Sequence, residues 1–404
     1  MSREPVIVGI GLSDYPKAPH LDSFGHIVQS TQRALADCGL ALGDIDGFAC
    51  AAMPTDPELH VEAIEHLGLR PRWVNTTYTG GSAAQSQIPD AAAAIRDGRA
   101  ETILFAYGSD FYTRFGRTLG TGGLSVEGGL SGLLMYEQTY GSTIASCYAL
   151  AATRHMAEYA TTSEQLAKIA VGVREFAGLN PNALYQKPLT VDDVLASPMI
   201  ADPLHLLDCC VVADGGAAFI MTTEERARDL KQPMVHVLGA AAATTHWHIH
   251  SMPDFTTTAG VEAYRQADAG PADIDTVQFY DSFTITAMLL LEDNGFWEKG
   301  EGRREKGEGR REKGEGRREK GEGGAFVDEG HLRRGGRLPL NTDGGGLSSC
   351  HSGMRGTMLV TEAVRQLRGH GGASQVPDCE LALVAGCGGL LPYVGTTILG
   401  RDRA

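Results

Sequence analysis

The 404-residue chain contains no segment that approaches 18 uninterrupted apolar residues, so we expect nothing in it to span a bilayer. It also lacks an excess of positive charge, because 35 Lys and Arg stand against 50 Asp and Glu, for a formal net charge of −15. This balance argues against general affinity for nucleic acid or anionic membranes. The N-terminus shows no apolar signal-peptide core, which favours a cytosolic protein.

Paired cysteine motifs are missing as well. The eight cysteines are scattered and form no CxxC spacing, which indicates a reduced protein without disulfides or structural zinc. The glycine-rich stretch at 122–134 lacks the lysine of a phosphate-binding loop and the GxGxxG pattern. A histidine cluster, HWHIH at 246–250, places alternate His on one face of a strand, but no Cys or acidic partner stands at a recognisable spacing. We therefore expect no metal site.

What the chain does contain is a duplication. VNTTYTGGSAAQ at 74–85 leads through a helix-like stretch to a strand at 102–110, and PLNTDGGGLSS at 339–349 leads through another to a strand at 381–389. Each copy has an Asn-Thr pair and a double glycine before a helix. Two half-domains of like order predict a duplicated α/β fold.

The alternation of apolar runs predicts the elements of the first half. Strand-like and helical patterns alternate as in βαβα units, so we expect a largely parallel sheet that is buried on both faces. From about 112 to 215 helices and glycine-rich loops replace this pattern, which indicates an inserted lid or interface region. The halves are then 1–232 and 233–404. The expected strands are 6–11, 46–52, 73–77 and 102–108, and the expected helices are 22–38, 58–67 and 82–98.

A low-complexity repeat interrupts the second half. EKGEGRR occurs three times from residue 298 and is followed by EKGEG, which ends at 323. Its period of seven brings no apolar residue to bury, so it cannot form a coiled coil. We interpret 298–323 as a disordered loop that arose by in-frame expansion; a functional charged arm is the alternative.

Tyr78 is the first candidate site residue. It stands where the chain leaves a strand and turns through Gly80 and Gly81 into a helix, which presents the side chain beside backbone amides able to hold an anion. A tyrosine there is a poor acyl-carrying nucleophile but a reasonable proton donor. A tyrosine that only packs at the domain centre is the alternative.

His351 and Cys387 are the next candidates. His351 follows the glycines Gly345 and Gly346 in the second copy of the turn, so the pseudo-twofold relation brings it toward Tyr78. Cys387 ends a strand next to Gly388, which permits close backbone approach. Near a His, this Cys could serve as a general acid or base because its pKa lies within reach of neutrality. Either residue could instead be an ordinary buried core residue.

Tyr280 and Asp281 end another strand of the second half, where α/β folds place ligands. Asp281 could equally cap the apolar helix that follows, which we favour over catalysis. The residues expected to bind substrate are Gly80, Gly81, Asp281, Gly345, Gly346 and Gly388.

Together these motifs resemble the thiolase superfamily, and within it the sterol-carrier-type, lipid-transfer thiolase-like proteins. The segments that carry the resemblance are LLDCCVVADGGAAFIM, LNTDGGGLSSCHSGMRG, TEAVRQLRG and VAGCGG. The resemblance implies a thiolase-like α/β fold of two duplicated αβαβα halves with an inserted loop region. It also implies a tight homodimer and a site for an acyl-CoA thioester, with coenzyme A as part of the substrate and no further cofactor.

The resemblance assigns roles residue by residue. Thiolases hold their acyl-accepting Cys where this chain has Tyr78. The His of the thiolase GHPxG motif matches His351, although Cys and Ser flank it here. The second thiolase Cys, which handles the proton at the substrate α-carbon, matches Cys387. Tyr280 replaces the Asn or His of the NEAF or HDCF segment.

The tyrosine at position 78, in place of the acyl-accepting Cys, changes the reaction that the resemblance implies. A covalent acyl-enzyme needs a thiolate, and tyrosine supplies neither the nucleophilicity nor the leaving group. Acid and base groups at Tyr78, Tyr280, His351 and Cys387 suffice for retro-aldol cleavage of a β-hydroxyacyl-CoA. Thiolase-like aldolases that shorten steroid side chains use tyrosines and pair with a small OB-fold acyl-CoA-binding protein, but their second catalytic tyrosine falls at His351.

Two other functions remain open from the sequence. The first is an acyltransferase of the acetyl-CoA acetyltransferase type that recruits another nucleophile, for which Cys387 is the well-placed candidate. The second is a non-catalytic acyl-CoA or lipid carrier, or a scaffold subunit of a larger complex.

Overall fold

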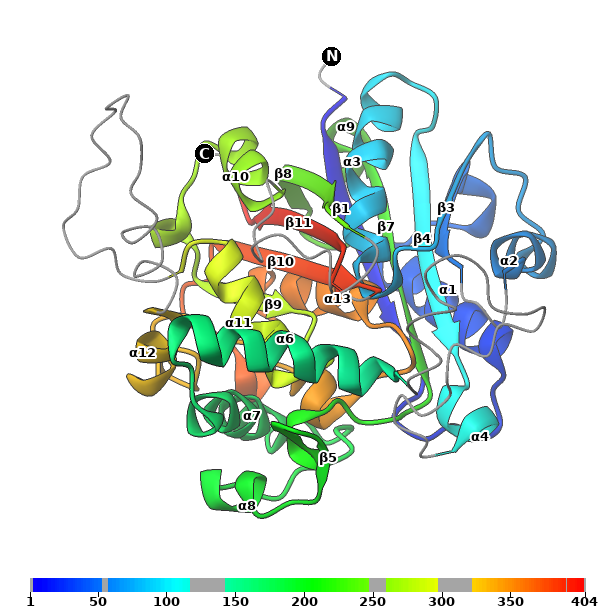
Figure 1. Cartoon of the computed structure of the whole chain (residues 1–404). Coiled ribbons are helices and arrows are strands. Elements are labelled where there is room, and N and C mark those ends of the chain that lie inside the picture. The colour runs from blue at the N-terminus through cyan, green and yellow to red at the C-terminus, as the bar shows by residue number, and fades with distance from the viewer. Residues whose placement is uncertain are drawn as a thin grey trace.

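The protein is built around a mixed sheet with helices on both sides (Figure 1). A computed structural model describes residues 3–52, 57–116, 142–246, 259–296, 322–389 and 391–402. Within these ranges, no helix is long and apolar enough to cross a membrane.

Nine strands form the main sheet, in the order β3-β2-β4-β7-β1-β8-β11-β10-β9, and β5 pairs with β6 apart from it. The strands are β1 (Pro5–Leu12), β2 (Gly47–Ala51), β3 (Trp73–Thr77), β4 (Thr102–Ser109), β5 (Met199–Ala201), β6 (Leu204–His205), β7 (Gly215–Thr223), β8 (Val235–Thr244), β9 (Thr276–Phe279), β10 (Leu381–Gly388) and β11 (Tyr393–Gly400).

Helices precede, connect and follow these strands. They are α1 (Ser23–Cys38), α2 (Leu59–Leu67), α3 (Ala83–Arg96), α4 (Phe111–Phe115), α6 (Ile144–Tyr159), α7 (Ser163–Ala177), α8 (Val191–Leu195), α9 (Glu224–Ala227), α10 (Ala259–Ala267), α11 (Thr284–Asp293), α12 (Glu322–Asp328) and α13 (Gly356–Leu367). The first half matches the expected strands and helices 22–38, 58–67 and 82–98 to within two residues.

The strand order confirms the duplication. From the centre outward, the first half runs β1, β7, β4, β2, β3, and the second half runs β8, β11, β10, β9. A parallel bridge between Val277 and Leu340 places the PLNT segment beside β9, where the first half has β3 beside β2. The two Asn-Thr segments therefore occupy equivalent positions at the two ends of the sheet.

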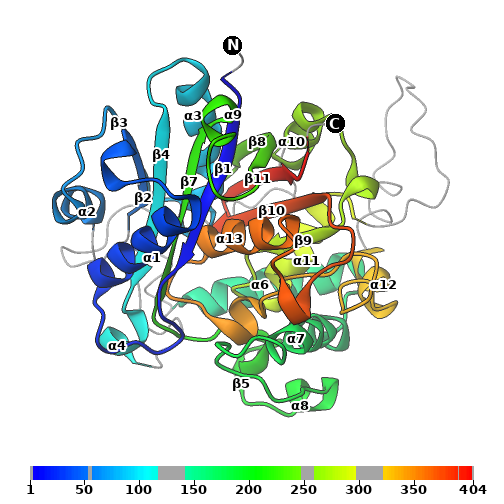
Figure 2. The same ribbon diagram turned by 180° about the vertical axis from the view of Figure 1, so that it is seen from behind.

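The two halves join through a short contact. Only Val6 and Ile7 of β1 pair with β8. Helices α3 and α13 contact strands of both halves, so they form a layer between them. Figure 2 shows α1 in front of β1 and β7, on the outer face of the first half, while α10 packs on β8 and β11 of the second. These layers correspond to the αβαβα arrangement.

The expectation of a largely parallel sheet is correct for part of the sheet and wrong for the whole. Strands β2, β3 and β4 pair in parallel, as do β9 and β10. However, β7 pairs antiparallel with both β1 and β4, and β11 does the same between β8 and β10. The first four strands of the chain still run in one direction. Strand β7 is antiparallel to both of its neighbours, so β1 and β4 on either side of it are parallel to each other.

The region expected as an insertion lies outside the main sheet. Its described residues form α4, α6, α7, α8 and the β5–β6 pair. In Figure 1, α6 crosses the front of the molecule with α7 below it. Both contact α11, whose ten residues TITAMLLLED are apolar on almost every side and nearly all buried.

Two expected features fall mainly outside the described residues. The glycine-rich stretch at 122–134 does so entirely, and so does the EKGEGRR repeat up to residue 321. The expected loop 298–323 ends too late, because α12 already begins at Glu322.

Candidate functional site

The end of β9 carries the strongest pair of reactive side chains. Tyr280 follows β9 directly, and His351 follows a π-helical turn, Gly345–Ser349. The Tyr280 hydroxyl lies 2.8 Å from Nε2 of His351, and the two rings meet edge to face with centroids 5.4 Å apart. Both side chains are buried. The sequence indicated Tyr280 and His351 as independent candidates, and in the structure their side chains are in contact.

Burial sets the protonation states of this pair. It lowers the pKa of His351 to about 4, with the Arg355 guanidinium acting in the same direction, and it raises the pKa of Tyr280 well above the usual range. At neutral pH His351 is therefore neutral and Tyr280 is a phenol. The Tyr280 hydroxyl also donates to the Gly353 carbonyl at 3.4 Å, and the tautomer of His351 decides whether Nε2 accepts from this hydroxyl or donates to it.

Asp281 holds the turn that carries His351. Its carboxylate accepts hydrogen bonds from the backbone N–H of Gly346, at 2.7 Å, and of Leu347, at 3.1 Å. Burial raises the pKa of Asp281 to about 6, against the opposing effect of Arg355. The expected helix cap is wrong, because Phe283 is the N-cap residue of α11. Asp281 is fully buried and supports the turn.

The glycines of the second turn allow the Asp281 carboxylate to lie directly against the backbone of the turn. A Cβ on Gly345 would lie 2.1 Å from the Asp281 carboxylate, and one on Gly346 would lie 3.0 Å from it. Both backbone N–H groups are already engaged, that of Gly345 with Asp343 and that of Gly346 with Asp281. These amides therefore face the protein and are occupied, which leaves them unsuited to the substrate-binding role that the sequence suggested.

The first turn packs closely against the end of β10. A Cβ on Gly388 would lie 1.8 Å from the Thr79 carbonyl oxygen, and one on Gly80 would lie 3.0 Å from the Gly389 nitrogen. Gly81 lies on the Tyr280 ring, since a Cβ there would be 2.1 Å from Cζ. The first turn therefore packs on Tyr280, while Gly345 and Gly346 of the second turn pack on the adjacent Asp281.

Tyr78 itself stands apart from the buried pair. Its side chain is 49% exposed, and its hydroxyl makes no hydrogen bond to the described residues. Partial burial raises the pKa of Tyr78, with a smaller effect from Tyr393. Tyr78 therefore lies at the edge of the site, where a ligand can reach it.

Cys387 is buried in β10 and is a thiol at neutral pH. Burial raises its pKa to about 12. The expectation that this pKa lies within reach of neutrality is wrong, because the Cys387 side chain is almost completely buried, which disfavours the thiolate. A thiol of this kind can give up a proton to a strong base, but it is not a resting nucleophile.

The sequence missed Tyr148. This residue lies in α6, within the inserted region, and its hydroxyl donates a hydrogen bond to the Gly389 carbonyl at 3.0 Å. Tyr148 is also an electrostatic neighbour of Tyr280 and contributes to the raised pKa of that phenol. No local motif marks it, and only the position of α6 across the second half could have revealed it.

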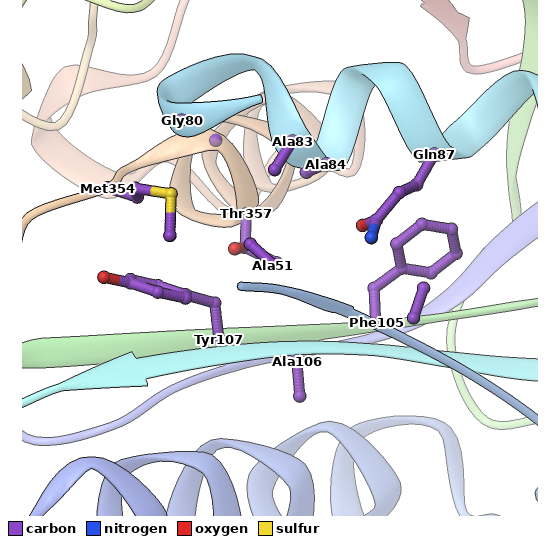
Figure 3. Close-up of a pocket in the computed structure, with 12 residues that line it drawn as sticks. Ala51, Gly80, Ala83, Ala84, Gln87, Phe105, Ala106, Tyr107, Met354 and Thr357 are labelled. Atoms are coloured by element: carbon purple, nitrogen blue, oxygen red, sulfur yellow. The ribbon is translucent and has the colours of Figure 1, made fainter. Parts of the chain in front are cut away.

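A small, mostly apolar pocket lies between α3 and the strands β2 and β4, and its lining includes neither Tyr280 nor His351 (Figure 3). Tyr107 and Met354 lie at one end, near Gly80, and Phe105 and Gln87 lie at the other. The Tyr107 hydroxyl donates to the Ser352 carbonyl at 2.8 Å, beside His351. Alanines at 49, 51, 83, 84 and 106 supply much of the remaining wall.

The histidine cluster at 246–250 lies mostly outside the described residues. Only His246 of 246–250 falls within the described residues. Across those residues, no three His, Cys, Asp or Glu side chains gather in a way that could hold a metal ion.

Comparison with known proteins gives a consistent set of relatives. A family model described as "Thiolase C-terminal domain-like" matches residues 241–317 and 315–401. A steroid side-chain-cleaving aldolase from Thermomonospora curvata is 34% identical over 98% of each chain. A 17-hydroxy-3-oxo-4-pregnene-20-carboxyl-CoA lyase from Mycobacterium tuberculosis is 32% identical over 91% of this chain and 92% of its own. An acetyl-CoA acetyltransferase from Methanothermobacter thermautotrophicus is 31% identical over 96% of this chain and 97% of its own.

Solved structures agree on the fold. A structure described as "Ltp2-ChsH2(DUF35) aldolase" superimposes with a TM-score of 0.82 at 31% identity, covering 100% of this chain and 99% of the other. The human mitochondrial 3-ketoacyl-CoA thiolase superimposes with a TM-score of 0.67 at 13% identity, over 99% of each chain, which supports the fold alone.

Proposed function

Because the chain belongs to the thiolase superfamily, we propose that it is an acyl-CoA lyase that cleaves a carbon–carbon bond by a retro-aldol reaction. The observation that carries this proposal is the buried contact of 2.8 Å between Tyr280 and His351. It couples a proton acceptor to a phenol at a site where Tyr78 replaces the thiol that thiolysis requires.

The reaction follows from the protonation states. The β-hydroxyl of the substrate gives its proton to Tyr280 as Tyr280 passes its own to neutral His351. The bond between the α- and β-carbons breaks, a carbonyl forms at the β-carbon, and the electron pair becomes a thioester enolate. Cys387, still a thiol at neutral pH, protonates the α-carbon. Solvent then returns the proton from His351 to Cys387, and no covalent intermediate forms.

The substrate class is drawn from the relatives whose names describe this chemistry. Two of them cleave steroid side chains or a steroid acyl-CoA by name. We therefore propose a β-hydroxyacyl-CoA of lipid or steroid side-chain breakdown as the substrate. Coenzyme A enters and leaves as a thioester, so the proposal needs no additional cofactor.

The partners are also proposals. The relative that matches this chain at a TM-score of 0.82 is named as a complex with a DUF35 protein, which supports a small acyl-CoA-binding partner of that kind here. A homodimer is supported by β3, which ends the sheet and pairs only with β2 among the described residues. Its Val74 is 43% exposed, and an open strand edge of this kind favours pairing with a second copy.

We also propose a boundary between the two halves of the chain and a cytoplasmic location for the protein. We place the boundary near residue 232, because β1 and β8 open the two equivalent sets of strands. Cytoplasmic action is supported by the eight cysteines, all of which are free thiols.

The Tyr280→Phe variant tests the function directly. We expect a loss of cleavage of roughly 100-fold or more with a β-hydroxyacyl-CoA, because general acid–base groups contribute about that much. Tyr264→Phe is the control, since Tyr264 is a partly buried tyrosine outside the pair whose hydroxyl donates to the Asn294 carbonyl at 3.2 Å. Equal turnover by both variants would contradict the proposal. A stable acyl adduct on a cysteine would instead support an acyltransferase.

A further inference from the structure

A second, larger cavity lies between α7 and the loop that follows α12, two helices that are neighbours in Figure 1. Its volume is about 870 Å³, and its walls are α7, the loop 329–337 and a short segment at 186–189. Its lining includes neither Tyr280 nor His351. The cavity is therefore separate from the candidate site, and its volume suits a small molecule.

The charge around this cavity is opposite in sign to that of the whole chain. Four arginines and two glutamates line it, in a protein whose formal net charge is −15. Both glutamates already have partners. Glu175 accepts a hydrogen bond from Nε of Arg333 at 2.9 Å, and Glu329 lies 2.8 Å from Nε2 of His331. The cavity therefore carries an excess of positive charge.

Arg174, on α7, is the buried arginine of the lining, with only 7% of its surface exposed. Its hydrogen bonds go to neutral groups, because Nε donates to Ser348 Oγ at 2.7 Å and Nη1 donates to the Lys187 carbonyl at 3.3 Å. Among the described residues it has no ion pair, and its Nη2 has no hydrogen-bond partner. Since a buried charge without a counter-charge is costly, Arg174 points to an anion that enters from the cavity.

Arg334 is an exposed arginine of the same lining and belongs to the loop rather than to α7. Its side chain forms no ion pair or hydrogen bond with the described residues. The loop is compact at this point, since a Cβ on Gly336 would lie 2.4 Å from the His331 carbonyl oxygen. Two guanidinium groups without a carboxylate, Arg174 and Arg334, therefore reach one cavity from two different elements.

We propose that this cavity binds an organic diphosphate of the nucleotide class, with its phosphates held by Arg174 and Arg334. Guanidinium groups bind phosphate oxygens through paired, charge-assisted hydrogen bonds, and two such groups suit a ligand with more than one phosphate. Val171, Pro188 and Leu189 add apolar wall for the organic part of the ligand. The inference does not depend on the proposed function.

Two sources supply this ligand chemistry, a free nucleotide and the nucleotide part of a coenzyme A thioester. We expect the free nucleotide, because the cavity lining contains none of the groups proposed to react. Arg174 nevertheless links the cavity to the site, since its partner Ser348 lies in the turn Gly345–Ser349 that precedes His351.

Isothermal titration calorimetry of the full-length protein with ADP tests the site, and adenosine serves as the probe without phosphates. We expect ADP to bind, more weakly at high salt, and adenosine not to bind. Arg334→Gln should weaken ADP binding roughly 10-fold and Arg174→Met roughly 10- to 100-fold, since each removes charge-assisted hydrogen bonds. Arg174→Lys keeps the charge and should retain part of the affinity.

Arg228→Gln is the matched control, because Arg228 is an exposed arginine that pairs with Glu224 and lies outside the cavity. It should bind ADP as the wild type does. Arg334→Gln decides the test even if Arg174→Met fails to fold, since Arg334 is exposed and its replacement leaves the core intact. Wild-type affinity in Arg334→Gln, or no saturable binding of ADP to the wild type, would overturn the inference.

A second titration of ADP, with coenzyme A present at saturation, distinguishes the two sources. Unchanged ADP binding assigns the cavity to a free nucleotide. Displacement of ADP, together with weaker binding of coenzyme A by Arg334→Gln, assigns it to the diphosphate of the thioester. Cleavage of a β-hydroxyacyl-CoA is measured separately, so failure of the cavity assignment leaves the lyase standing.

Discussion

At the scale of single residues, function depends on how burial assigns protons. His351 is held neutral and Cys387 is held as a thiol, both because the surrounding protein excludes water. Without a mobile thiolate, the site favours proton transfer over acyl transfer. The presence of both residues could be predicted from their motifs. Their protonation could not, because it depends on packing from elements far apart in the sequence.

The lowered pKa of His351 predicts a pH dependence of stability. The native state resists protonation down to about pH 4, while an unfolded histidine takes its proton near pH 6.5. Between these values the unfolded form of His351 binds more protons, so His351 should lower the free energy of unfolding by about 2–3 kcal/mol as the pH drops from 6.5 to 4, while Asp281, whose pKa is raised to about 6, acts in the opposite direction. Urea unfolding of wild type and His351→Gln at several pH values measures this slope.

The His351→Gln variant should lose that part of the slope. The acid limb of kcat/KM for the wild type should likewise lie near pH 4, since His351 is already neutral above it. A limb near pH 6.5, or equal slopes for the two proteins, would show that His351 is not the buried neutral base described above.

At the scale of elements, the two copies of the Asn-Thr turn have diverged. Asn341 uses its side chain to hydrogen-bond both backbone groups of Phe279, at 2.8 and 2.9 Å, and so extends the sheet beside β9. It also adopts a φ of 51°, a conformation that Asn tolerates better than most residues. Asn75 in the first copy makes one exposed bond to Asp90.

This divergence predicts unequal effects on stability. Asn341→Ala leaves two buried backbone groups of Phe279 without their partner and places alanine at positive φ, so we expect a loss of about 2–4 kcal/mol. Asn75→Ala, the matched control, should cost less than about 1 kcal/mol. Urea denaturation measures both. Similar losses at the two positions would contradict the role assigned to Asn341.

The elements themselves were largely predictable, and the reasons are local. Strands such as β4 and helices such as α1 follow from apolar periodicity and from the cap at Asp22, whose carboxylate accepts from Gly25 N. The antiparallel placement of β7 between β1 and β4 was not predictable, because strand order depends on long-range pairing. Tyr148 was missed for the same reason. It reaches the site only after α6 has crossed the second half.

At the scale of the whole molecule, the proposed dimer depends on the open edge at β3. Val74→Lys places a charge on that edge and should convert the dimer to a monomer of the chain mass, 42.9 kDa. Val61→Lys is the control, because Val61 is similarly exposed, at 49%, but lies on α2. Sedimentation velocity distinguishes the outcomes. A wild-type monomer, or a dimer that survives Val74→Lys, would refute β3 as the interface.

The candidate site is built from both halves of the duplicated fold. The turn after β3 and the turn after Leu340 both pack on the segment that follows β9, with Gly81 on Tyr280 and Gly345 on Asp281. The site therefore exists only when both halves are folded and packed. The groups proposed to react come from the second half, and the first half supplies a wall together with the exposed Tyr78.

The central claim is cleavage of a carbon–carbon bond without an acyl-enzyme, and the most direct measurement is a product balance during turnover. The full-length protein, together with any partner that co-purifies with it, is given a β-hydroxyacyl-CoA labelled in its acyl chain. We predict one carbonyl product and one shortened acyl-CoA per substrate, with no free coenzyme A and no labelled protein by intact mass spectrometry. Free coenzyme A with label bound to a cysteine would contradict the account.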